Sequence, residues 1–293
     1  MLNALTIDVE DYFHVAAFAR QIDPKTWDSY PLRVEKNTNR LLDLLGARDV
    51  RATFFVLGWV AERCPDLVKR IQSAGHEIGC HGYAHQAIYD GTYEDFEHDL
   101  RRAKAVIENI TGRALKSYRA PSFSITSATL WALAVLSEQG FEYDSSIFPV
   151  AHDLYGIPDA PRFPHLKVLD AEHVIKEFPP STLRFLGVNV PVGGGGYLRL
   201  LPHGWTALAI RRLNEVEKQP VMVYLHPWEI DQEQPRIPAS WRSRFRHYNN
   251  LSTAEEKIRR LLGEFSFSTM EDVVRSQSLE RKNCGRTLRY DSR

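Results

Sequence analysis

Length and charge limit the class of this protein at once. The chain has 293 residues, 43% of them hydrophobic and 25% charged, which suffices for one large barrel-like domain or two ordinary ones. Because 37 basic side chains balance 37 acidic ones, no net charge draws the chain to nucleic acid or to an anionic membrane. The first eight residues lack a basic leader, and no window approaches the ~18 consecutive apolar residues of a spanning helix, so we expect a soluble protein.

The first half of the chain alternates predicted strands and helices. Residues 2–9 and 52–58 are apolar runs typical of strands buried on both faces, and between them apolar side chains recur at helical spacing from Val34 to Leu45. The pattern then predicts a helix over 59–74, a strand over 76–80, a helix from Phe96 to Ile110, an extended run over 118–121, a helix over 127–139 and a strand over 141–143. Repeated strand–helix units favour a parallel sheet or barrel.

The second half gives weaker signals. Residues 148–202 are rich in proline and glycine, so we expect long loops over a barrel mouth, with one strand near 174–178. The later pattern predicts a helix over 205–217, a buried strand over 220–226, a helix around Ile258 and Leu262, a strand over 265–268 and a polar tail.

Acidic residues follow the first predicted strand. Asp8, Glu10 and Asp11 lie where that strand gives way to a loop, which is the catalytic edge of a parallel barrel. Such a cluster can equally cap a following helix. The acid run alone does not decide between these two roles.

Two histidines follow the predicted strand over 76–80. His81 and His85 are four residues apart, so their imidazoles can converge on one ion if the segment is helical. The spacing alone is a weak signal, and most such pairs are structural. Together with a strand-end carboxylate, however, two imidazoles form a three-ligand set that leaves coordination positions open, as catalytic sites require.

Two further strand ends carry polar side chains. Arg119 ends the extended run over 118–121, where its guanidinium can hold a neighbouring carboxylate ionised, although a surface ion pair would be the simpler explanation. His226 ends the strand over 220–226, where a catalytic histidine is more expected than a core one. Packing can account for any one of these polar residues at a strand end. It accounts less well for all of them at the same edge of a sheet.

Three other features have ordinary explanations. Cys80 suits a small buried residue better than a soft metal ligand, and the wide spacing of Cys64, Cys80 and Cys284 favours reduced thiols in a cytoplasmic protein. The run of glycines over 193–196 lacks the following Gly-Lys-Ser or Gly-Lys-Thr of a phosphate loop, which predicts a flexible rim. The basic and aromatic segment 242–248 can contact a polyanion or a sugar, but a solvated face is the simpler expectation.

In their order along the chain, these motifs resemble the polysaccharide deacetylase superfamily, carbohydrate esterase family 4, also called the NodB homology group. Thr6–Asp11 is similar to its acid motif, His81–His85 to its histidine motif, Arg119–Pro121 to its arginine motif and Leu225–His226 to its last motif. Longer stretches resemble the subfamily associated with exosortase (PEP-CTERM) and exopolysaccharide loci, namely 8–13, 118–124, 143–146, 226–230 and 245–248. The resemblance implies an α/β fold, a distorted (β/α)7 barrel over 1–234, with 235–293 as an extension packed on the barrel or completing it.

The resemblance also implies a set of roles. It assigns a divalent metal, usually Zn²⁺, to Glu10, His81 and His85, and it assigns catalysis to Asp8 as base, Arg119 as partner of the base, His226 as general acid and Asp144 as the residue that orients His226. The common family motif has two adjacent aspartates, of which the second binds metal, whereas this chain has Val9 there. A subset of the superfamily spaces the two acids one residue apart, so Glu10 rather than Asp11 is the expected ligand.

The implied activity is removal of N-acetyl groups from N-acetylhexosamine units of an exopolysaccharide or its biosynthetic precursor. The expected partners are an N-acetylated saccharide and the exopolysaccharide-synthesis machinery, with no nucleic acid. Two alternatives stay open: an amidohydrolase of a cyclic amide or ureide on the same fold, and a non-catalytic binding protein of the exopolysaccharide machinery, which Val9 at the usual ligand position motivates. Nothing in the sequence indicates an oligomeric state.

Overall fold

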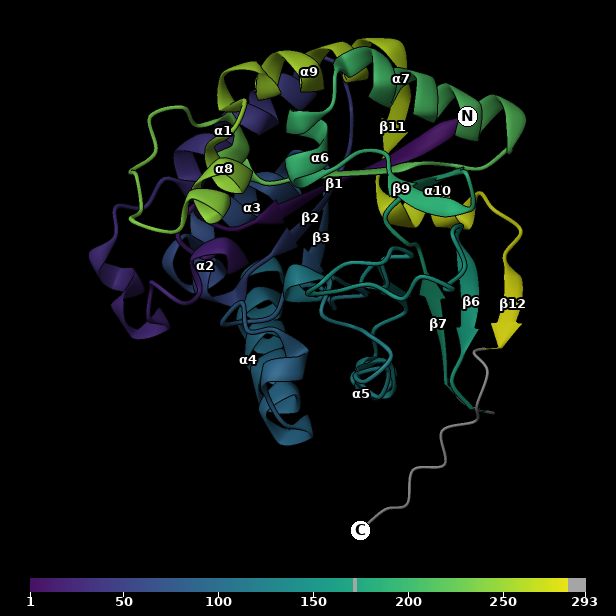
Figure 1. The fold of residues 1–293 in the computed structure, drawn as a ribbon. Helices are drawn as coiled ribbons and strands as arrows, with labels where there is room; N and C mark the ends of the chain where they lie inside the picture. Colours follow the sequence, from purple (N-terminus) through teal and green to yellow (C-terminus); the bar gives the residue numbers. More distant parts are fainter. Residues whose placement is uncertain (171–172, 284–293) are drawn as a thin grey trace.

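Seven mutually parallel strands form a curved sheet at the centre of the molecule (Figure 1). The computed structural model describes residues 1–170 and 173–283. In sheet order the strands are β10 (Met222–Leu225), β1 (Leu2–Val9), β2 (Thr53–Val56), β3 (Glu77–Cys80), β4 (Ser117–Tyr118), β5 (Tyr143–Asp144) and β7 (Val174–Glu177). Within the described residues, no hydrogen-bonded ladder joins β7 to β10. The curved sheet is therefore an open half-barrel and not a closed barrel. The expected α/β barrel architecture is confirmed in this open form.

Further strands extend this sheet at both sides. Beyond β7 lie β6 (His165–Val168), which is antiparallel to β7, and β12 (Glu280–Asn283), which is parallel to β6. β11 (Ser266–Ser268) pairs with the beginning of β1. A separate hairpin consists of β8 (Thr182–Phe185) and β9 (Val188–Pro191). The residues after 234, expected as an extension, thus contribute β11 and β12 to the sheet.

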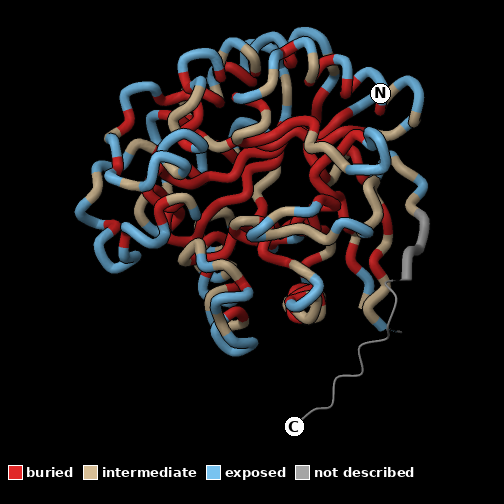
Figure 2. The backbone as a smooth tube through the Cα atoms, in the orientation of Figure 1, coloured by how far each residue is buried: buried red, intermediate tan, exposed pale blue. Residues whose placement is uncertain are grey.

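Helices cover the outer face of the sheet. The helices of the described chain are α1 (Val34–Gly46), α2 (Gly58–Arg63), α3 (Pro65–Ser73), α4 (Tyr93–Thr111), α5 (Ala132–Glu138), α6 (Gly195–Leu200), α7 (His203–Arg211), α8 (Trp241–Tyr248), α9 (Leu251–Glu264) and α10 (Met270–Arg275), of which α10 packs on the inner face instead. Short 3-10 helices are η1 (Ala16–Phe18), η2 (Pro24–Ser29), η3 (Ile88–Asp90), η4 (Pro121–Phe123) and η6 (Pro227–Ile230), and the π-helix η5 (Arg212–Val216) continues α7. Burial follows this layering, because the parallel strands at the centre are mostly buried while the surrounding helices expose their outer faces (Figure 2). None of the described helices has the length and apolarity needed to cross a membrane.

Alternation along β1 separates the core from the site. Leu5, Ile7 and Val9 belong to the large apolar cluster that includes the outer helices, where burying each such side chain contributes about 1.5–3 kcal/mol. The alternate residues Thr6 and Asp8 are also buried, on the inner face of the curved sheet. The side-chain period of two therefore places Asp8 inside the half-barrel and gives Val9 a packing role.

Helix α10 fills the amino-terminal end of the half-barrel. Its residues Met270, Val273 and Val274 pack with a second apolar cluster that includes Ala4 and Phe55 of the inner face. At the start of α10 the Glu271 N–H donates to Glu77 Oε2 (3.1 Å) and the Met270 N–H donates to Thr53 Oγ1 (2.7 Å). This end of the sheet is closed by packing, which leaves the opposite end for chemistry.

Several sequence expectations need correction. The helix expected over 59–74 is two helices, because Cys64 adopts a non-helical conformation directly before Pro65, whose ring cannot continue the preceding helix. The expected long loops over 148–202 contain β6, β8, β9 and α6, and the expected polar tail contains α10 and β12. Cys64 and Cys80 are buried free thiols, as expected for Cys80, whereas Cys284 lies outside the described residues.

The glycine run is not a free rim. Gly194 forms a bridge to Tyr224, and a Cβ at Gly194 would lie only 2.0 Å from Tyr224 Cε1. Gly195 begins α6 with a positive φ of 46°. Glycine is therefore required here for close backbone approach to β10 and for a left-handed start of the helix, rather than for mobility.

Candidate metal and catalytic site

One cavity of about 200 Å³ collects the polar strand ends. Asp8 and Glu10 reach it from the end of β1, His81 and His85 from the segment after β3, and His226 from the end of β10. Because β10, β1 and β3 are parallel members of one sheet, their carboxyl ends lie at the same edge. The structure thus brings together five of the seven side chains that the sequence singled out.

The two histidines converge without a helix. The segment after β3 is a loop in which Gly82 and His85 both have left-handed φ angles, 71° and 50°. Asp99 of α4 holds the loop by accepting the Tyr83 N–H (2.7 Å) and the Ala84 N–H (2.9 Å). A Cβ at Gly82 would lie 3.0 Å from Asp99 Oδ2, so glycine allows this carboxylate to approach. The expectation of a helical pair is wrong, since loop geometry rather than helical spacing directs both imidazoles inward.

Glu10, His81 and His85 form a cluster with metal-ligand geometry. One potential ligand atom from each lies within 4.8 Å of the others. His85 Nε2 and Glu10 Oε2 are 2.6 Å apart, yet Glu10 Oε2 is buried and makes no hydrogen bond of acceptable geometry. A buried carboxylate oxygen left in this state costs free energy that a cation can recover. The donor set therefore fits a divalent metal.

His81 is prepared as a neutral ligand. Its Nδ1 lies 2.8 Å from the carbonyl oxygen of Arg119, so Nδ1 carries the hydrogen and Nε2 keeps its lone pair. Burial lowers the pKa of His81 to about 4, although nearby Asp8 and Glu10 oppose the shift. A backbone carbonyl that fixes the tautomer of a histidine in this way is the usual support of a metal ligand.

Glu10 is kept ionised by its neighbours. Burial alone would raise the pKa of its carboxyl, but the contact with His85 and the nearby His226 and His81 outweigh burial and lower the pKa. Trp228 Nε1 donates to the other carboxylate oxygen, Oε1, at 3.1 Å. One oxygen of Glu10 is thus oriented by protein while the other faces the histidines.

Asp11 does not compete for this position. Its Oδ1 accepts the Tyr12 N–H (2.9 Å), and its Oδ2 accepts the N–H groups of Arg33 (2.6 Å) and Val34 (2.8 Å) at the start of α1. Burial raises its pKa to about 6 despite these hydrogen bonds. The two roles considered for the acid run are thus divided between its residues. Asp11 caps a helix, and Glu10 faces the histidines.

Asp8 is paired with a wholly buried arginine. Arg119 Nη1 donates to Asp8 Oδ1 (2.7 Å) and to Thr6 Oγ1 (2.8 Å), and its Nη2 donates to Ser145 Oγ (2.9 Å). The guanidinium also lies over the ring of Phe55, 4.4 Å from its centroid. Arg119 is therefore a buried part of the site, and the simpler explanation of a surface ion pair is wrong.

His226 is supported by a chain of charges. Its Nδ1 lies 2.6 Å from Glu229 Oε1, and Glu229 Oε2 lies 3.4 Å from Nε of the buried Arg199 on α6. The other ring nitrogen, Nε2, lies 3.7 Å from both Asp8 Oδ2 and Glu10 Oε1. Burial lowers the pKa of His226, but the hydrogen bond to Glu229 and the nearby carboxylates outweigh burial and raise the pKa to about 9.

Asp144 does not orient His226. Its carboxylate accepts the Ser146 hydroxyl (2.6 Å) and the Ser146 N–H (3.2 Å), and burial raises its pKa, although the contacts with Glu177 and Ser146 oppose the shift. The acidic partner of His226 is Glu229, three residues later on the 3-10 turn η6. The expectation for Asp144 is corrected, because strand β5 directs this carboxylate to its own backbone turn.

Sequence reasoning missed three residues of this support. Glu229 and Trp228 belong to a stretch that already carried the family resemblance. Glu229 follows His226 by three residues, and this spacing could have predicted a contact between them on a 3-10 turn. Nothing in the sequence indicated a role for Arg199, because its contacts depend on where α6 packs. Its guanidinium donates to the carbonyls of Arg246, His247 and Asn249 at the end of α8.

Two family models match consecutive parts of the chain. Residues 25–143 match the family described as polysaccharide deacetylase, and residues 145–275 match a domain of unknown function, DUF3473. The boundary between these matches falls beside residue 144, whereas the sequence placed one at 234. His81, His85 and Arg119 lie in the first matched region and His226 in the second, so the cavity is assembled from both.

Curated relatives resemble part of the chain. A peptidoglycan-N-acetylglucosamine deacetylase of Bacillus cereus is 35% identical over 105 residues, which cover 36% of this chain and 37% of the relative. The chain spans well under half of the length of the curated relatives it matches.

Two solved structures define the fold. A Mycobacterium smegmatis protein assigned as a polysaccharide deacetylase aligns over 97% of this chain and 93% of its own, with a TM-score of 0.64 and 21% identity. A family 4 carbohydrate esterase pseudoenzyme of Bacillus anthracis aligns over 96% of this chain and 66% of its own, with a TM-score of 0.51 and 14% identity. At these identities the two structures show that the fold is shared, and nothing about activity.

Proposed function

We propose that this chain is a metal-dependent hydrolase that removes the N-acetyl group from N-acetylhexosamine units of a saccharide. The observation that carries the proposal is the cluster of Glu10, His81 and His85, with Asp8 and His226 in the same cavity. The Bacillus cereus relative, named as a deacetylase of peptidoglycan N-acetylglucosamine, supports an acetylated saccharide as the substrate class.

Zinc is the metal we propose for this cluster. Two imidazoles and one carboxylate are a common ligand set of catalytic zinc, and they leave positions open for substrate and water. When bound, the metal supplies Lewis acidity, which polarises the acetamide carbonyl and lowers the pKa of the attacking water toward ~7.

Asp8 takes the proton from the attacking water in this proposal. Its pairing with Arg119 fixes the orientation of one oxygen, Oδ1. The second oxygen, Oδ2, remains directed toward His226 and the cavity. A base prepared in this way contributes about 10²–10⁴-fold to the rate.

His226 donates a proton to the departing amine. Glu229 fixes the ring through Nδ1, so Nε2 is the nitrogen that meets the substrate. The reaction cleaves the amide C–N bond and yields acetate and a free amino sugar, with the water proton accepted at Asp8 and the amine proton supplied by His226.

The finer features of the proposal rest on sequence motifs and thiol chemistry. The stretches shared with the exosortase-associated subfamily support an exopolysaccharide, or its biosynthetic precursor, as the acceptor. The buried free thiols of Cys64 and Cys80 support a reducing, cytoplasmic site of action.

Acetate release tests the activity. The purified chain is incubated with zinc and N-acetylglucosamine oligosaccharides, and in parallel with small cyclic amides and ureides. We expect acetate from the oligosaccharides, its loss with a chelator, and its return with zinc. Ring opening without acetate release would favour the cyclic-amide alternative. A chain that binds no zinc and releases no acetate after metal addition would be the non-catalytic binding protein instead.

A further inference from the structure

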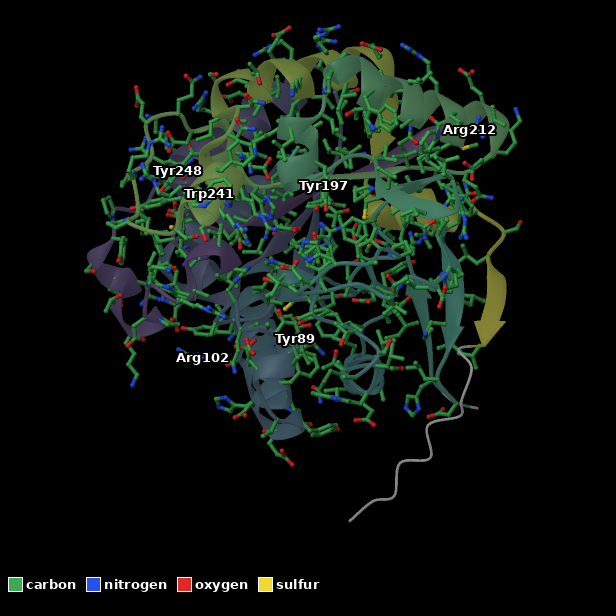
Figure 3. The ribbon with its side chains drawn as sticks, viewed as in Figure 1. Tyr89, Arg102, Tyr197, Arg212, Trp241 and Tyr248 are labelled. Atoms are coloured by element: carbon green, nitrogen blue, oxygen red, sulfur yellow. The ribbon has the colours of Figure 1, made fainter. Side chains whose placement is uncertain are left out.

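Helix α8 exposes an aromatic and basic face beside the candidate site. Trp241 and Phe245 are one helical turn apart, and they are 72% and 51% exposed. Trp241 and Tyr248 lie together on α8 in Figure 3, on the outside of the molecule. Monomeric proteins rarely expose large aromatic side chains in a group unless they bind something there.

Arginines surround this aromatic face. Arg236 lies over the ring of Tyr248, 4.2 Å from its centroid, and Arg242 lies 5.8 Å from the ring centroid of Trp241. Together with Arg244 and Arg246 they make four guanidinium groups, none of which pairs with a carboxylate within 4 Å in the described part of the chain. The six residues Arg236, Trp241, Arg244, Phe245, Tyr248 and Asn249 line a groove of about 340 Å³.

Helix α8 also contributes residues to the candidate site. Arg246 and His247 of the same helix line the cavity that holds the metal-ligand cluster. The His247 ring stacks on Trp228 (centroids 4.2 Å apart), and Trp228 stacks on His226 (5.1 Å). Because Arg199 also binds the last carbonyls of α8, the helix has a fixed position relative to His226.

We propose that this face, here called the α8 surface and defined by the six groove residues with Arg242 and Arg246, binds acidic groups of the saccharide chain whose acetylated unit occupies the site. The proposal rests on the proposed deacetylase function and names its substrate class: an N-acetylated polysaccharide that carries carboxylates. Guanidinium forks bind carboxylates in bidentate fashion, and the exposed aromatic rings supply apolar faces for the C–H side of sugar rings.

A saccharide fits the α8 surface better than a membrane does. Unpaired arginines and aromatic rings suit both ligands, but α8 lines both the cavity and the groove, so a saccharide that occupies the cavity has the α8 surface close by. Exposed ion pairs are individually weak and are screened by salt. Two to three of them together amount to about a tenfold gain in affinity at low ionic strength.

Two oligosaccharides of equal length test the preference for charge. Hyaluronan hexasaccharide carries carboxylates and N-acetylglucosamine, whereas chitin hexasaccharide carries N-acetylglucosamine alone. Calorimetry on the zinc-loaded chain should give hyaluronan an affinity about tenfold higher at low salt, and high salt should remove the advantage. The double variant Arg242→Gln with Arg244→Gln should abolish the preference. Arg212→Gln, an exposed arginine far from α8 in Figure 3, should retain it.

Equal affinity for the two oligosaccharides would overturn the proposal, as would an equal loss in Arg212→Gln. So would anionic phosphatidylglycerol vesicles that bind through Arg242 and Arg244 while hyaluronan shows no preference. Acetate release is measured separately on the same samples. A charge preference without acetate release would support the α8 surface and refute the deacetylase function, so the two failures are distinguishable.

Discussion

Asp8 and His226 reach the same cavity, but their supports come from different regions. Asp8 is held by one buried arginine, Arg119, and both residues stand at ends of barrel strands. His226 is held by Glu229 on a 3-10 turn and then by Arg199 on α6, which also fixes the end of α8. The proposed base, Asp8, is therefore held within the sheet, while the support of the proposed acid, His226, depends on how later helices pack. We therefore expect that the support of His226 can be weakened without loss of bound metal.

The largest expected effect is the loss of a metal ligand. His81→Ala should reduce both bound zinc and acetate release to background, because two ligands do not hold the ion that activates the water. Metal content by mass spectrometry and acetate release are measured on the same sample. His98→Ala, an exposed histidine on α4, is the matched control and should retain both. Full activity in His81→Ala would contradict the proposed metal site.

Asp8→Asn should separate chemistry from metal binding. The amide cannot accept the water proton, so turnover should fall about 10²–10⁴-fold while zinc remains bound. The readouts are kcat for acetate release and zinc stoichiometry. Asp43→Asn on the exposed face of α1 should behave like the unchanged chain. Zinc loss in Asp8→Asn would show that Asp8 is a ligand and not the base.

Glu229→Gln should weaken proton donation by His226 without affecting metal binding. The glutamine amide oxygen can still accept a hydrogen bond from His226 Nδ1, but the negative charge between His226 and Arg199 is lost. We therefore expect turnover to fall about 10²-fold, with bound zinc unchanged. Melting temperature is followed too, because an unpaired buried arginine lowers stability. Exposed Glu256→Gln on α9 is the control. Loss of zinc in Glu229→Gln would mean that the support of His226 and the metal site are not separable.

The smallest effect concerns His76, before the start of β3 and far along that strand from His81. Its Nδ1 accepts the Ala52 N–H (3.1 Å), and burial lowers its pKa to about 4. As pH falls below the ordinary value of about 6.5, the unfolded state binds a proton that the folded state resists, so stability is lost. Between pH 7.5 and 5 this residue accounts for about 2 kcal/mol of lost unfolding free energy. Urea unfolding of His76→Gln should show a pH dependence smaller by that amount, and an unchanged dependence would contradict this assignment.

Long buried runs made the first half of the fold predictable. The strands at 2–9, 53–56 and 77–80 and the helices α1 and α4 follow from periodicity, and so does the common edge at which Glu10, His81 and His226 meet. Strands β6, β8 and β9 could not be seen in the same way. They are four residues long, and charged side chains such as Lys167 and Arg184 interrupt their apolar pattern.

Details of the site depended on local backbone conformation. The left-handed φ of Gly82 and His85 directs the histidines inward, and no period in the sequence encodes it. The choice of Glu10 over Asp11 came from family resemblance, and the structure gives its physical basis in the backbone N–H groups that saturate Asp11. Glu229 replaced Asp144 as the partner of His226 because a 3-10 turn brings residues three apart into contact, which strand–helix patterns do not reveal.

Anomalous diffraction at the zinc edge, on crystals grown with zinc, tests the central assignment most directly. The account predicts a single peak bound by Glu10, His81 and His85, with Asp8 still paired to Arg119 and not coordinated. A peak coordinated by Asp8 or Asp11 in place of Glu10, or no peak in this cavity at saturating zinc, would contradict it.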